Sequence, residues 1–331
     1  MRKTNFAYFI CVAFLISCST PPSFGQGSLK LEKEITLPGV KGRIDHIDID
    51  VEGQIAYVAA LGNNTVEVVD LKKGVFLHSV TGLSEPQGVA YISKHHELFV
   101  ANGGTGECLF YNTVTFQKTG SIKYDDDADD VRYDELTDKI YVGYGGGGIG
   151  IIDAATHKQR VNIKLPAHPE SFQLDSKDGK IWVNLPGAGS IGVIDIKQGK
   201  LIDQWKRVLP RSNFPMAYDA AQHRVMVGFR IPATLKVLDS RSGKELFSSV
   251  MVGDVDDFYW DDKTKQILVS GGDGSVNIFR QTGATYKQLA DIKTRNGART
   301  SLFIPELRLF LLAARASGDR PAALLIYRLT D

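Results

Sequence analysis

The sequence predicts an all-β fold, and two features of the chain point to it. A short apolar triplet recurs seven times along the 331 residues, and each unit around it contains only strand and turn patterns. The triplets are centred on Tyr57, Phe99, Tyr141, Trp182, Met226, Leu268 and Phe310, with spacings of 42, 42, 41, 44, 42 and 42 residues. A period in the low forties built from strands alone is typical of a propeller, because a lone sheet must stack on its neighbours to cover its faces. We therefore expect a seven-bladed β-propeller of four-stranded antiparallel blades.

The innermost strand of each blade is predicted from an alternation ten and eight residues before the triplet centre. Ile47 and Ile49 hold these places in the first unit, and Val131 and Tyr133 hold them in the third. Apolar residues at period two mark a strand with one buried face. We expect both positions to lie in the core of every blade.

Turn residues predict the remaining strands. Glycine and asparagine follow most triplets, as in Gly62-Asn63-Asn64, and they suit tight hairpins that need positive φ. The next strand commonly ends on an acid or amide whose side chain can accept backbone N–H groups of the following turn. These capping residues are Asp70, Asn112, Asp153, Asp195 and Asp239.

Ring closure is predicted from the two ends of the repeat array. The last unit supplies only three strands, the third running from Ala323 to Leu329, whereas Leu29 to Leu37 forms a spare alternating strand ahead of the first unit. We expect this N-terminal strand to complete the seventh blade, which removes an exposed sheet edge. Residues 29–331 then form one domain, because stacked repeats share a continuous core.

Residues 1–25 have the pattern of a signal peptide. Arg2 and Lys3 precede eleven apolar residues from Phe6 to Ile16, a run too short to span a bilayer as a helix. Leu15 to Cys18 is similar to a bacterial lipobox, in which Cys18 is the lipidated residue. Cleavage after Gly25 by an ordinary signal peptidase is the alternative. Either route places the protein outside the cytoplasm, in the periplasm, on the outer membrane as a lipoprotein, or secreted, and a lipid anchor would be its one contact with a membrane.

Composition excludes several classes of protein. Without residues 1–25 the chain has 37 Lys and Arg against 38 Asp and Glu, a net charge of −1, so bulk charge does not direct it to nucleic acid. Of the three cysteines, only Cys108 lies in the repeats, where its position in the third strand predicts a small buried side chain. We expect no disulfide framework, and we expect a monomer.

Several motifs are better explained by structure. Gly143 to Gly148 matches a dinucleotide pattern, but it joins two predicted strands with no helix after it. Asp125 to Asp130 starts like a calcium loop, yet it lacks the Gly and Glu that such a loop requires. His95 and His96 lie in a predicted turn without ligands at zinc spacing.

The repeats resemble those of the bacterial YVTN-repeat β-propellers. The resemblance rests on units such as IYVGYGGGGIGIIDAATHK, IWVNLPGAGSIGVIDIKQGK and AYVAALGNNTVEVVDLKKG, with lead-ins such as EPQGVAY and HPESFQL, and it covers nearly all of the mature chain. It implies an extracytoplasmic propeller with no single function. Related propellers include lactonases, lyases and quinoprotein-like subunits.

The functional signal lies at the lead-in pair of each unit, the residues twelve and eleven positions before the triplet centre. These positions do not repeat, so packing does not fix them, and they should gather on one rim around the central channel. The pairs are Asp45/His46, Gln87/Gly88, Asp129/Asp130, Glu170/Ser171, Phe214/Pro215, Asp256/Asp257 and Ala298/Arg299. Arg43 and His168 lie two or three residues upstream of this level, and Arg230 and Arg315 are expected in nearby loops.

Convergent carboxylates of this kind can hold a hard cation or raise the pKa of one member. We expect the ligand site to comprise Arg43, Asp45, His46, Asp129, Asp130, Glu170, Asp256, Asp257 and Arg299. Asp130, Glu170 and Asp257 are the candidate ligands of a divalent cation such as Ca²⁺, and His46, His168 and Arg299 are the candidate catalytic groups. The alternative is structural, since acids at this level also cap turns and pair with arginines such as Arg132.

Two functions fit these residues. The first is an exported binding module that presents an acidic and arginine-lined pocket to a small ligand, a metal ion or a partner protein. The second is a metal-dependent hydrolase or lyase that acts on a lactone or acidic sugar, with a histidine as base and Arg299 neutralising substrate charge. The first is favoured because no nucleophile and base can be paired from the sequence.

Overall fold

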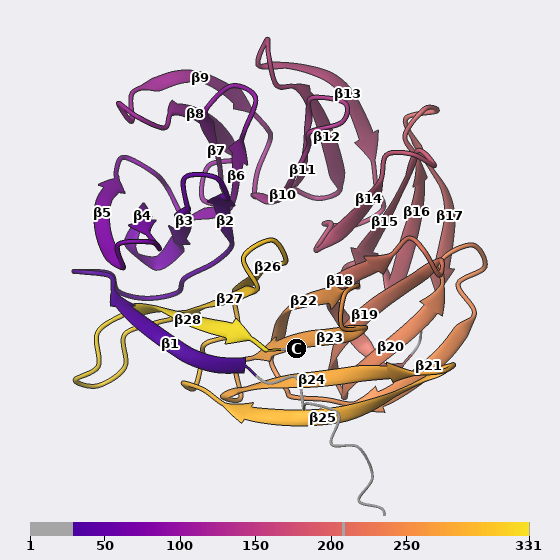
Figure 1. Ribbon diagram of the computed structural model, residues 1–331. Coiled ribbons are helices and arrows are strands. Elements are labelled where there is room, and N and C mark those ends of the chain that lie inside the picture. The colour runs from indigo at the N-terminus through magenta and orange to yellow at the C-terminus, as the bar shows by residue number, and fades with distance from the viewer. Residues whose placement is uncertain (1–28, 207–208, 331) are drawn as a thin grey trace, which may run out of the picture.

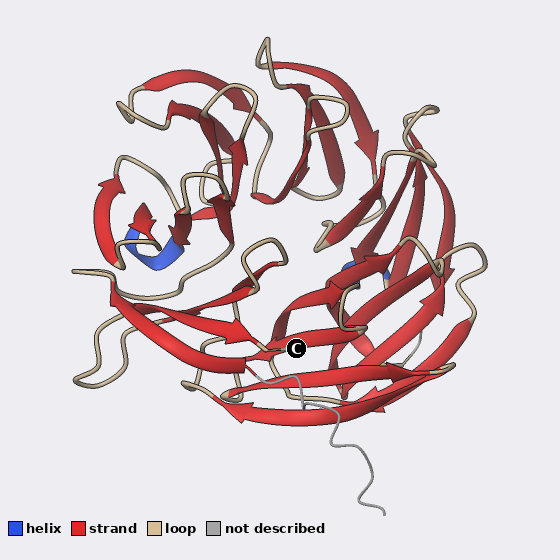
Figure 2. Cartoon of the chain, viewed as in Figure 1, coloured by secondary structure: helices blue, strands red, loops and turns tan. Residues whose placement is uncertain are grey.

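Alternating apolar residues and tight turns fold each repeat into a four-stranded antiparallel sheet, and seven such sheets form a ring (Figure 1). The structure is a computed structural model and describes residues 29–206 and 209–330. The predicted signal peptide, with Cys18, lies outside the described residues. The described chain is almost entirely strand and turn, with two short 3-10 turns at Leu61–Asn63 and Pro186–Ala188 (Figure 2).

The first three blades follow the chain in order from the channel outward. Blade 1 consists of β2 (Ile47–Asp50), β3 (Ile55–Ala60), β4 (Thr65–Asp70) and β5 (Val75–Val80). Blade 2 consists of β6 (Pro86–Ile92), β7 (Glu97–Asn102), β8 (Glu107–Asn112) and β9 (Lys118–Lys123). Blade 3 consists of β10 (Ala128–Asp134), β11 (Lys139–Tyr144), β12 (Gly148–Asp153) and β13 (Lys158–Lys164).

The next three blades repeat this order. Blade 4 consists of β14 (Phe172–Asp175), β15 (Lys180–Leu185), β16 (Ser190–Asp195) and β17 (Lys200–Lys206). Blade 5 consists of β18 (Arg211–Asp219), β19 (Arg224–Ile231), β20 (Ala233–Asp239) and β21 (Glu245–Val250). Blade 6 consists of β22 (Val255–Asp261), β23 (Gln266–Gly271), β24 (Ser275–Thr282) and β25 (Thr285–Lys293).

Blade 7 confirms the predicted closure of the ring. It consists of β26 (Ser301–Ile304), β27 (Leu309–Ala314), β28 (Ala323–Leu329) and, as its outer strand, β1 (Leu29–Thr36). β1 pairs antiparallel with β28 from Leu29 opposite Leu329 to Thr36 opposite Ala323, and the two strands lie side by side in Figure 1. The chain is therefore joined end to end by backbone hydrogen bonds, with no open edge at β28.

The core is divided among the seven junctions between neighbouring blades. Each junction holds its own apolar cluster, such as the one that joins Phe99 of blade 2 to Val142 of blade 3. All seven triplet centres are buried, with at most 4% of their surface exposed. Because each sheet is covered by its two neighbours, removing one blade would expose two clusters at once.

The innermost strands differ in one respect from the prediction. The residues ten positions before each triplet centre are all buried, but those eight positions before it are only partly buried in six blades, Ile49 being the exception. Five of the six, Tyr91, Tyr133, Tyr218, Trp260 and Leu302, line a cavity in the channel. These five side chains therefore pack partly against the clusters between blades and partly against the channel cavity.

The predicted turn caps are confirmed. Asp70 Oδ1 accepts the backbone N–H of Lys73 at 2.7 Å, and Asp195 Oδ1 accepts that of Gln198 at 2.8 Å. Asn112, Asp153 and Asp239 accept the corresponding N–H groups in their own blades. Each of these residues is thus explained by the turn that it caps. Within the described residues, no helix is long and apolar enough to cross a membrane.

Candidate functional site

β-Bulges open the inner strand of several blades at the level of the lead-in pairs. The register of the inner strand shifts between Pro86 and Val89, Ala128 and Val131, Asn213 and Met216, and Val255 and Asp257. Blade 1 has a similar irregularity, in which Asp45 and His46 both lie opposite Ala59. The N–H of Asp45 donates to the Ala59 carbonyl, and the N–H of Ala59 donates to the His46 carbonyl. A bulge re-aims side chains that strict alternation would send between the blades. At least one member of each lead-in pair is therefore directed to the mouth of the channel.

A left-handed residue precedes each of the four register shifts. Glu85, Asp127, Ser212 and Asp254 have φ of 49°, 37°, 61° and 50°. The carbonyls of three of them accept a hydrogen bond from a glycine of the hairpin in the same blade, as with Gly145 and Asp127 at 3.0 Å. The lead-in and the hairpin after the triplet consequently share one rim, as predicted.

The rim encloses a cavity of about 230 Å³, here called the mouth cavity. All seven blades contribute at least one member of a lead-in pair to its wall. Its lining residues are Arg43, Asp45, His46, Gln87, Asp127, Asp129, Asp130, His168, Glu170, Ser171, Phe214, Arg230, Asp256 and Arg299. Residues 256 positions apart in the chain, Arg43 and Arg299, therefore meet in one site.

A larger cavity of about 740 Å³, the channel cavity, lies along the innermost strands and also includes His46 and Ser171 in its wall. Asp257 lines the channel cavity and does not line the mouth cavity. Its Oδ2 accepts the backbone N–H of Ser301 at 2.7 Å. Burial raises the pKa of Asp257 to about 7, although the nearby His46 acts to lower it.

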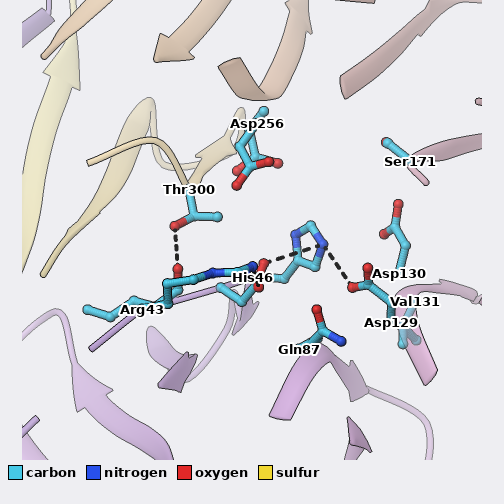
Figure 3. A network of polar contacts seen from close by, with 12 residues as sticks. Arg43, His46, Gln87, Asp129, Asp130, Val131, Ser171, Asp256 and Thr300 are labelled. Carbon is cyan, nitrogen blue, oxygen red and sulfur yellow. Dashed lines mark hydrogen bonds and ion pairs between the residues drawn. The ribbon is translucent and has the colours of Figure 1, made fainter. Parts of the chain in front are cut away.

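His46 lies between two carboxylates at the floor of the mouth cavity, as Figure 3 shows for the contact with Asp129. Its Nε2 is 3.7 Å from Asp129 Oδ1 and 3.9 Å from Asp45 Oδ1. Burial acts to lower the pKa of His46, but four surrounding carboxylates, that of Asp130 foremost, outweigh it and raise the pKa to about 10. His46 is therefore an imidazolium at neutral pH.

His168 makes a second cationic contact with the same aspartate. Its Nδ1 donates to the Gly145 carbonyl at 2.7 Å, and its Nε2 is 3.8 Å from Asp129 Oδ2. Burial acts to lower the pKa of His168, but Asp129, the Gly145 carbonyl and Asp127 raise it to about 9. Both contacts with Asp129 are longer than hydrogen bonds, and its buried Oδ1 has no hydrogen-bond partner among the described residues.

Glu170 is the least compensated acid of the cavity. Its carboxylate forms no hydrogen bond or ion pair with any residue in the described part of the chain. Burial, reinforced by the Asp129 carboxylate and opposed by His168, raises the pKa of Glu170 to about 8. It is thus mostly protonated at neutral pH and can serve as a proton donor there.

The arginines of the cavity are already paired. Asp256 accepts a hydrogen bond from Arg230 Nη2 at 2.5 Å and forms an ion pair with Arg299, whose Nε lies 2.9 Å from Asp256 Oδ2, while Arg299 Nη1 donates to Asp254 at 2.6 Å. The Arg230 guanidinium stacks on the Phe214 ring, 3.7 Å from its centroid. Blades 5, 6 and 7 are thereby tied together on one side of the mouth.

Two further predicted acids have partners in or beside the channel. Asp130 is buried and pairs with Arg132, whose Nη2 also donates to Ser171 Oγ at 3.2 Å. Asp45 accepts from Arg43 Nη2 at 2.8 Å, and half of the Arg43 side chain is exposed. The structural alternative, an acid paired with Arg132, therefore describes Asp130.

Most predicted site residues meet in the mouth cavity. Arg43, Asp45, His46, Asp129, Asp130, His168, Glu170, Asp256 and Arg299 all line it, and so does Arg230. Arg315 is exposed and does not line it. The prediction omitted Asp127, whose Oδ1 accepts from Gln87 Nε2 at 2.8 Å, and Asp254, which pairs with Arg299. Their repeated place fourteen residues before the triplet centre is the one signal that could have found them.

The divalent cation remains a prediction. Among the residues that the structure describes, no group of three or more His, Cys, Asp or Glu side chains is placed to hold a metal ion. Asp130, Glu170 and Asp257 are divided between an ion pair, an uncompensated position and the channel cavity. The observed geometry therefore gives this ligand set no support.

The remaining sequence motifs are structural. Gly143 to Gly148 forms the end of β11, the hairpin and the start of β12. His95 contacts Asp138 and His96 contacts the Tyr91 hydroxyl, both away from the mouth cavity. Cys108 is fully buried in β8, and burial raises the pKa of its thiol above the usual range.

Sheet topology and closure define the chain as a seven-bladed β-propeller. No family model matches the sequence, and no curated protein matches it. One similar solved chain comes from a structure titled "Crystal Structure of Mitotic Checkpoint Complex", with a TM-score of 0.79, 14% identity, and coverage of 100% of this chain and 99% of that chain. At this identity the likeness shows the fold alone, which is shared by many solved chains and selects no function.

Proposed function

We propose that the protein is an exported binding module whose mouth cavity holds a small polar ligand. One observation carries the proposal: every blade contributes a lead-in residue to the wall of a single cavity, and in five of the seven blades that residue is charged. Acids that only cap turns, such as Asp70, already have backbone partners. Asp129 Oδ1 and Glu170 lack partners within the described residues, so a ligand can satisfy them.

The size of the cavity limits the ligand. At about 230 Å³ it is smaller than the roughly 300–1,000 Å³ usual for drug-sized molecules. It fits a small metabolite or one side chain of a partner protein. Propellers are frequent scaffolds for protein partners, so both sources are open to this fold.

Thermal-shift measurements with small anionic, neutral and cationic compounds test the proposal. We compare wild type with Glu170→Gln, and use Glu306→Gln as the matched control because Glu306 lines only the channel cavity. A compound that stabilises wild type and Glu306→Gln but not Glu170→Gln supports a site in the mouth cavity. Equal shifts in all three proteins would contradict it.

Export and lipid attachment belong to the same proposal. The apolar run from Phe6 to Ile16 and the lipobox-like Leu15 to Cys18 support secretion followed by acylation of Cys18, as does the resemblance to extracytoplasmic YVTN-repeat propellers. Labelling with a radioactive fatty acid tests it directly. Wild type should incorporate the label and Cys18→Ser should not, whereas an unlabelled, correctly exported wild type would favour cleavage after Gly25.

The hydrolase or lyase alternative has less support. It requires a divalent metal held by rim carboxylates, and the candidate ligands do not converge within the described residues. Glu170, His168 and His46 could still exchange protons, but within the described residues Ser171, the one hydroxyl of the cavity wall, accepts from Arg132 and is hydrogen-bonded to no base.

A further inference from the structure

The three guanidinium groups of the mouth cavity leave little positive charge for an anionic ligand. Arg43 is bound to Asp45, and Arg230 and Arg299 share Asp256, with Asp254 as a second partner of Arg299. A ligand carboxylate or phosphate would have to displace one of these partners. Because breaking a hydrogen-bonded charge pair leaves one charge without its partner, this displacement disfavours an anion.

The opposite wall has unused acceptors. Asp129 Oδ1 has no hydrogen-bond donor among the described residues, and the Glu170 carboxylate has neither a donor nor an ion-pair partner there. Asp127 lies beside them and is 45% exposed; its Oδ1 accepts one hydrogen bond from Gln87, and its Oδ2 lies 3.8 Å from His168 Nδ1, beyond hydrogen-bond distance. This wall therefore offers oxygen atoms to a donor that the protein itself does not supply.

The charge of the lining points the same way. Six carboxyl groups, three guanidiniums and two histidines line the cavity. With both imidazoles protonated and every acid ionised the lining has a net charge of −1, and protonation of Glu170 brings it to zero. One monovalent cation can take the place of that proton.

We propose that the mouth cavity binds a small organic cation, an ammonium or guanidinium group, through Asp129 and Glu170 with Asp127 at the entrance. This specifies the ligand of the function proposed above and rests on it. An ammonium has three N–H donors, which suits several acceptors at hydrogen-bond distance and does not need the tight oxygen shell of a metal ion.

Binding of the cation releases a proton. Glu170 faces Asp129, Asp130, Asp256 and His168, and in the empty cavity its pKa is about 8. A cation beside it stabilises the carboxylate and lowers this pKa, so near pH 7 the binding of one cation should release about one proton. An adventitious surface contact would release none.

Calorimetric titration of the full-length protein with ethylamine, near pH 7 in two buffers of different ionisation enthalpy, measures both binding and proton release. Acetate and glycerol are the anionic and neutral probes. We expect ethylamine to bind with release of about one proton, and Glu170→Gln and Asp129→Asn to weaken it about tenfold or more, as expected for a charge-assisted hydrogen bond. Glu306→Gln should bind as wild type does, and melting curves of all variants check that they fold.

The outcomes separate the two proposals. Binding of acetate or glycerol that Glu170→Gln abolishes, without binding of ethylamine, would overturn the cation but keep a ligand site in the cavity. If none of the three probes binds, the proposal that the cavity recognises a cation is wrong. If no compound of the wider panel binds either, the proposal of a ligand site in the mouth cavity is wrong as well. Ethylamine that binds all variants equally also overturns the cation.

A blocked lysine, Nα-acetyl-lysine N-methylamide, distinguishes the sources of the cation. Tighter binding than ethylamine identifies a lysine side chain of a partner protein as the ligand. Binding of ethylamine without binding of the blocked lysine identifies a free amine. Either result supports the recognition of a cation by Asp129 and Glu170.

Discussion

Glu170 shows how strongly one position can depend on its surroundings. It follows Pro169 in a lead-in that forms no regular strand, and its N–H bonds to Asn184 of the neighbouring strand. This anchors the backbone while the side chain enters a space already occupied by Asp129 and His168. These surroundings raise the pKa of the Glu170 carboxyl group, so that its ionisation destabilises the folded protein.

Glu170→Gln should stabilise the protein at alkaline pH. The pKa of Glu170 is about 8 in the folded protein, above its ordinary value of 4.5, so its stabilising effect is complete below pH 4.5 and is lost as the pH rises through 8. Glutamine cannot ionise and avoids this loss. We expect a gain on the order of a few kcal/mol near pH 9 and a much smaller effect near pH 5, measured by urea unfolding. Equal effects at both pH values would contradict the assigned environment.

Asp256→Ala should be destabilising, because it removes a buried carboxylate that Arg230 and Arg299 share and leaves them the partly exposed Asp254 as a common partner. The expected loss is about 1.5–3 kcal/mol in the free energy of unfolding, as for hydrogen bonds to charged groups. Asp262→Ala is the control, since Asp262 pairs with Lys265 on the surface and is 69% exposed. Its loss should stay within about 1 kcal/mol. Similar losses for both variants would show that the shared pair does not join the blades.

At this scale the sequence predicted which residues meet, but not how they pair. The lead-in positions were identifiable because they vary where core positions repeat. Asp127 and Asp254 were marked only by their recurring place fourteen residues before the triplet centre, because left-handed residues are usually recognised as glycine or asparagine and here they are aspartates. The pairing of Asp130 with Arg132 was predicted as the structural alternative, but spacing alone could not decide between that pair and a ligand.

At the scale of the strand, the bulge at the start of an inner strand turns a lead-in side chain toward the mouth cavity. The period of the repeat predicted the strands well, since each triplet centre became a buried residue of the second strand. The bulges did not follow from the pattern, because one extra residue in a strand leaves the apolar alternation further along unchanged. The bulges of neighbouring blades also contact each other, as Gly88 of blade 2 does with Asp129 of blade 3.

Gly88→Ala should disturb both the fold and the site. A Cβ at Gly88 would lie 1.9 Å from the Asp129 carbonyl oxygen and 2.5 Å from Val131 Cγ2, so the bulge of blade 3 must shift. We expect a loss of about 1–3 kcal/mol and weaker binding of ethylamine, because Asp129 moves with its backbone. Gly146→Ala is the control, since nothing lies within 4 Å of its Cβ. Unfolding curves and titrations that match wild type for Gly88→Ala would refute the proposed contact.

At the scale of the molecule, the ring has to be closed for the rim residues of blades 1 and 7 to meet. Thr300 donates from its hydroxyl to the Ile44 carbonyl at 3.1 Å, which joins the two ends of the ring beside the site (Figure 3). Closure was predictable because a strand was missing at one end and spare at the other. The volume of the mouth cavity was not predictable, since it depends on fourteen lining residues at once.

Ile35→Ala should test closure by β1. Ile35 is 3% exposed and belongs to the cluster between blades 7 and 1, so its truncation should cost about 2–5 kcal/mol, as for any core residue. Leu31 on the same strand is 49% exposed, and Leu31→Ala should change stability by less than about 0.5 kcal/mol. If the denaturant midpoint of Ile35→Ala fell no further than that of Leu31→Ala, the packing of β1 against blade 7 would be contradicted.

A crystal structure of the protein with bound ethylamine tests most directly whether seven blades build one cation site. The predicted result is density for the amine in the mouth cavity, with its nitrogen about 2.7–3.2 Å from carboxylate oxygens of Asp129 and Glu170 and with the Arg230 and Arg299 pairs intact. Density for the amine only outside this cavity, with Asp129 and Glu170 still lacking a donor, would contradict it.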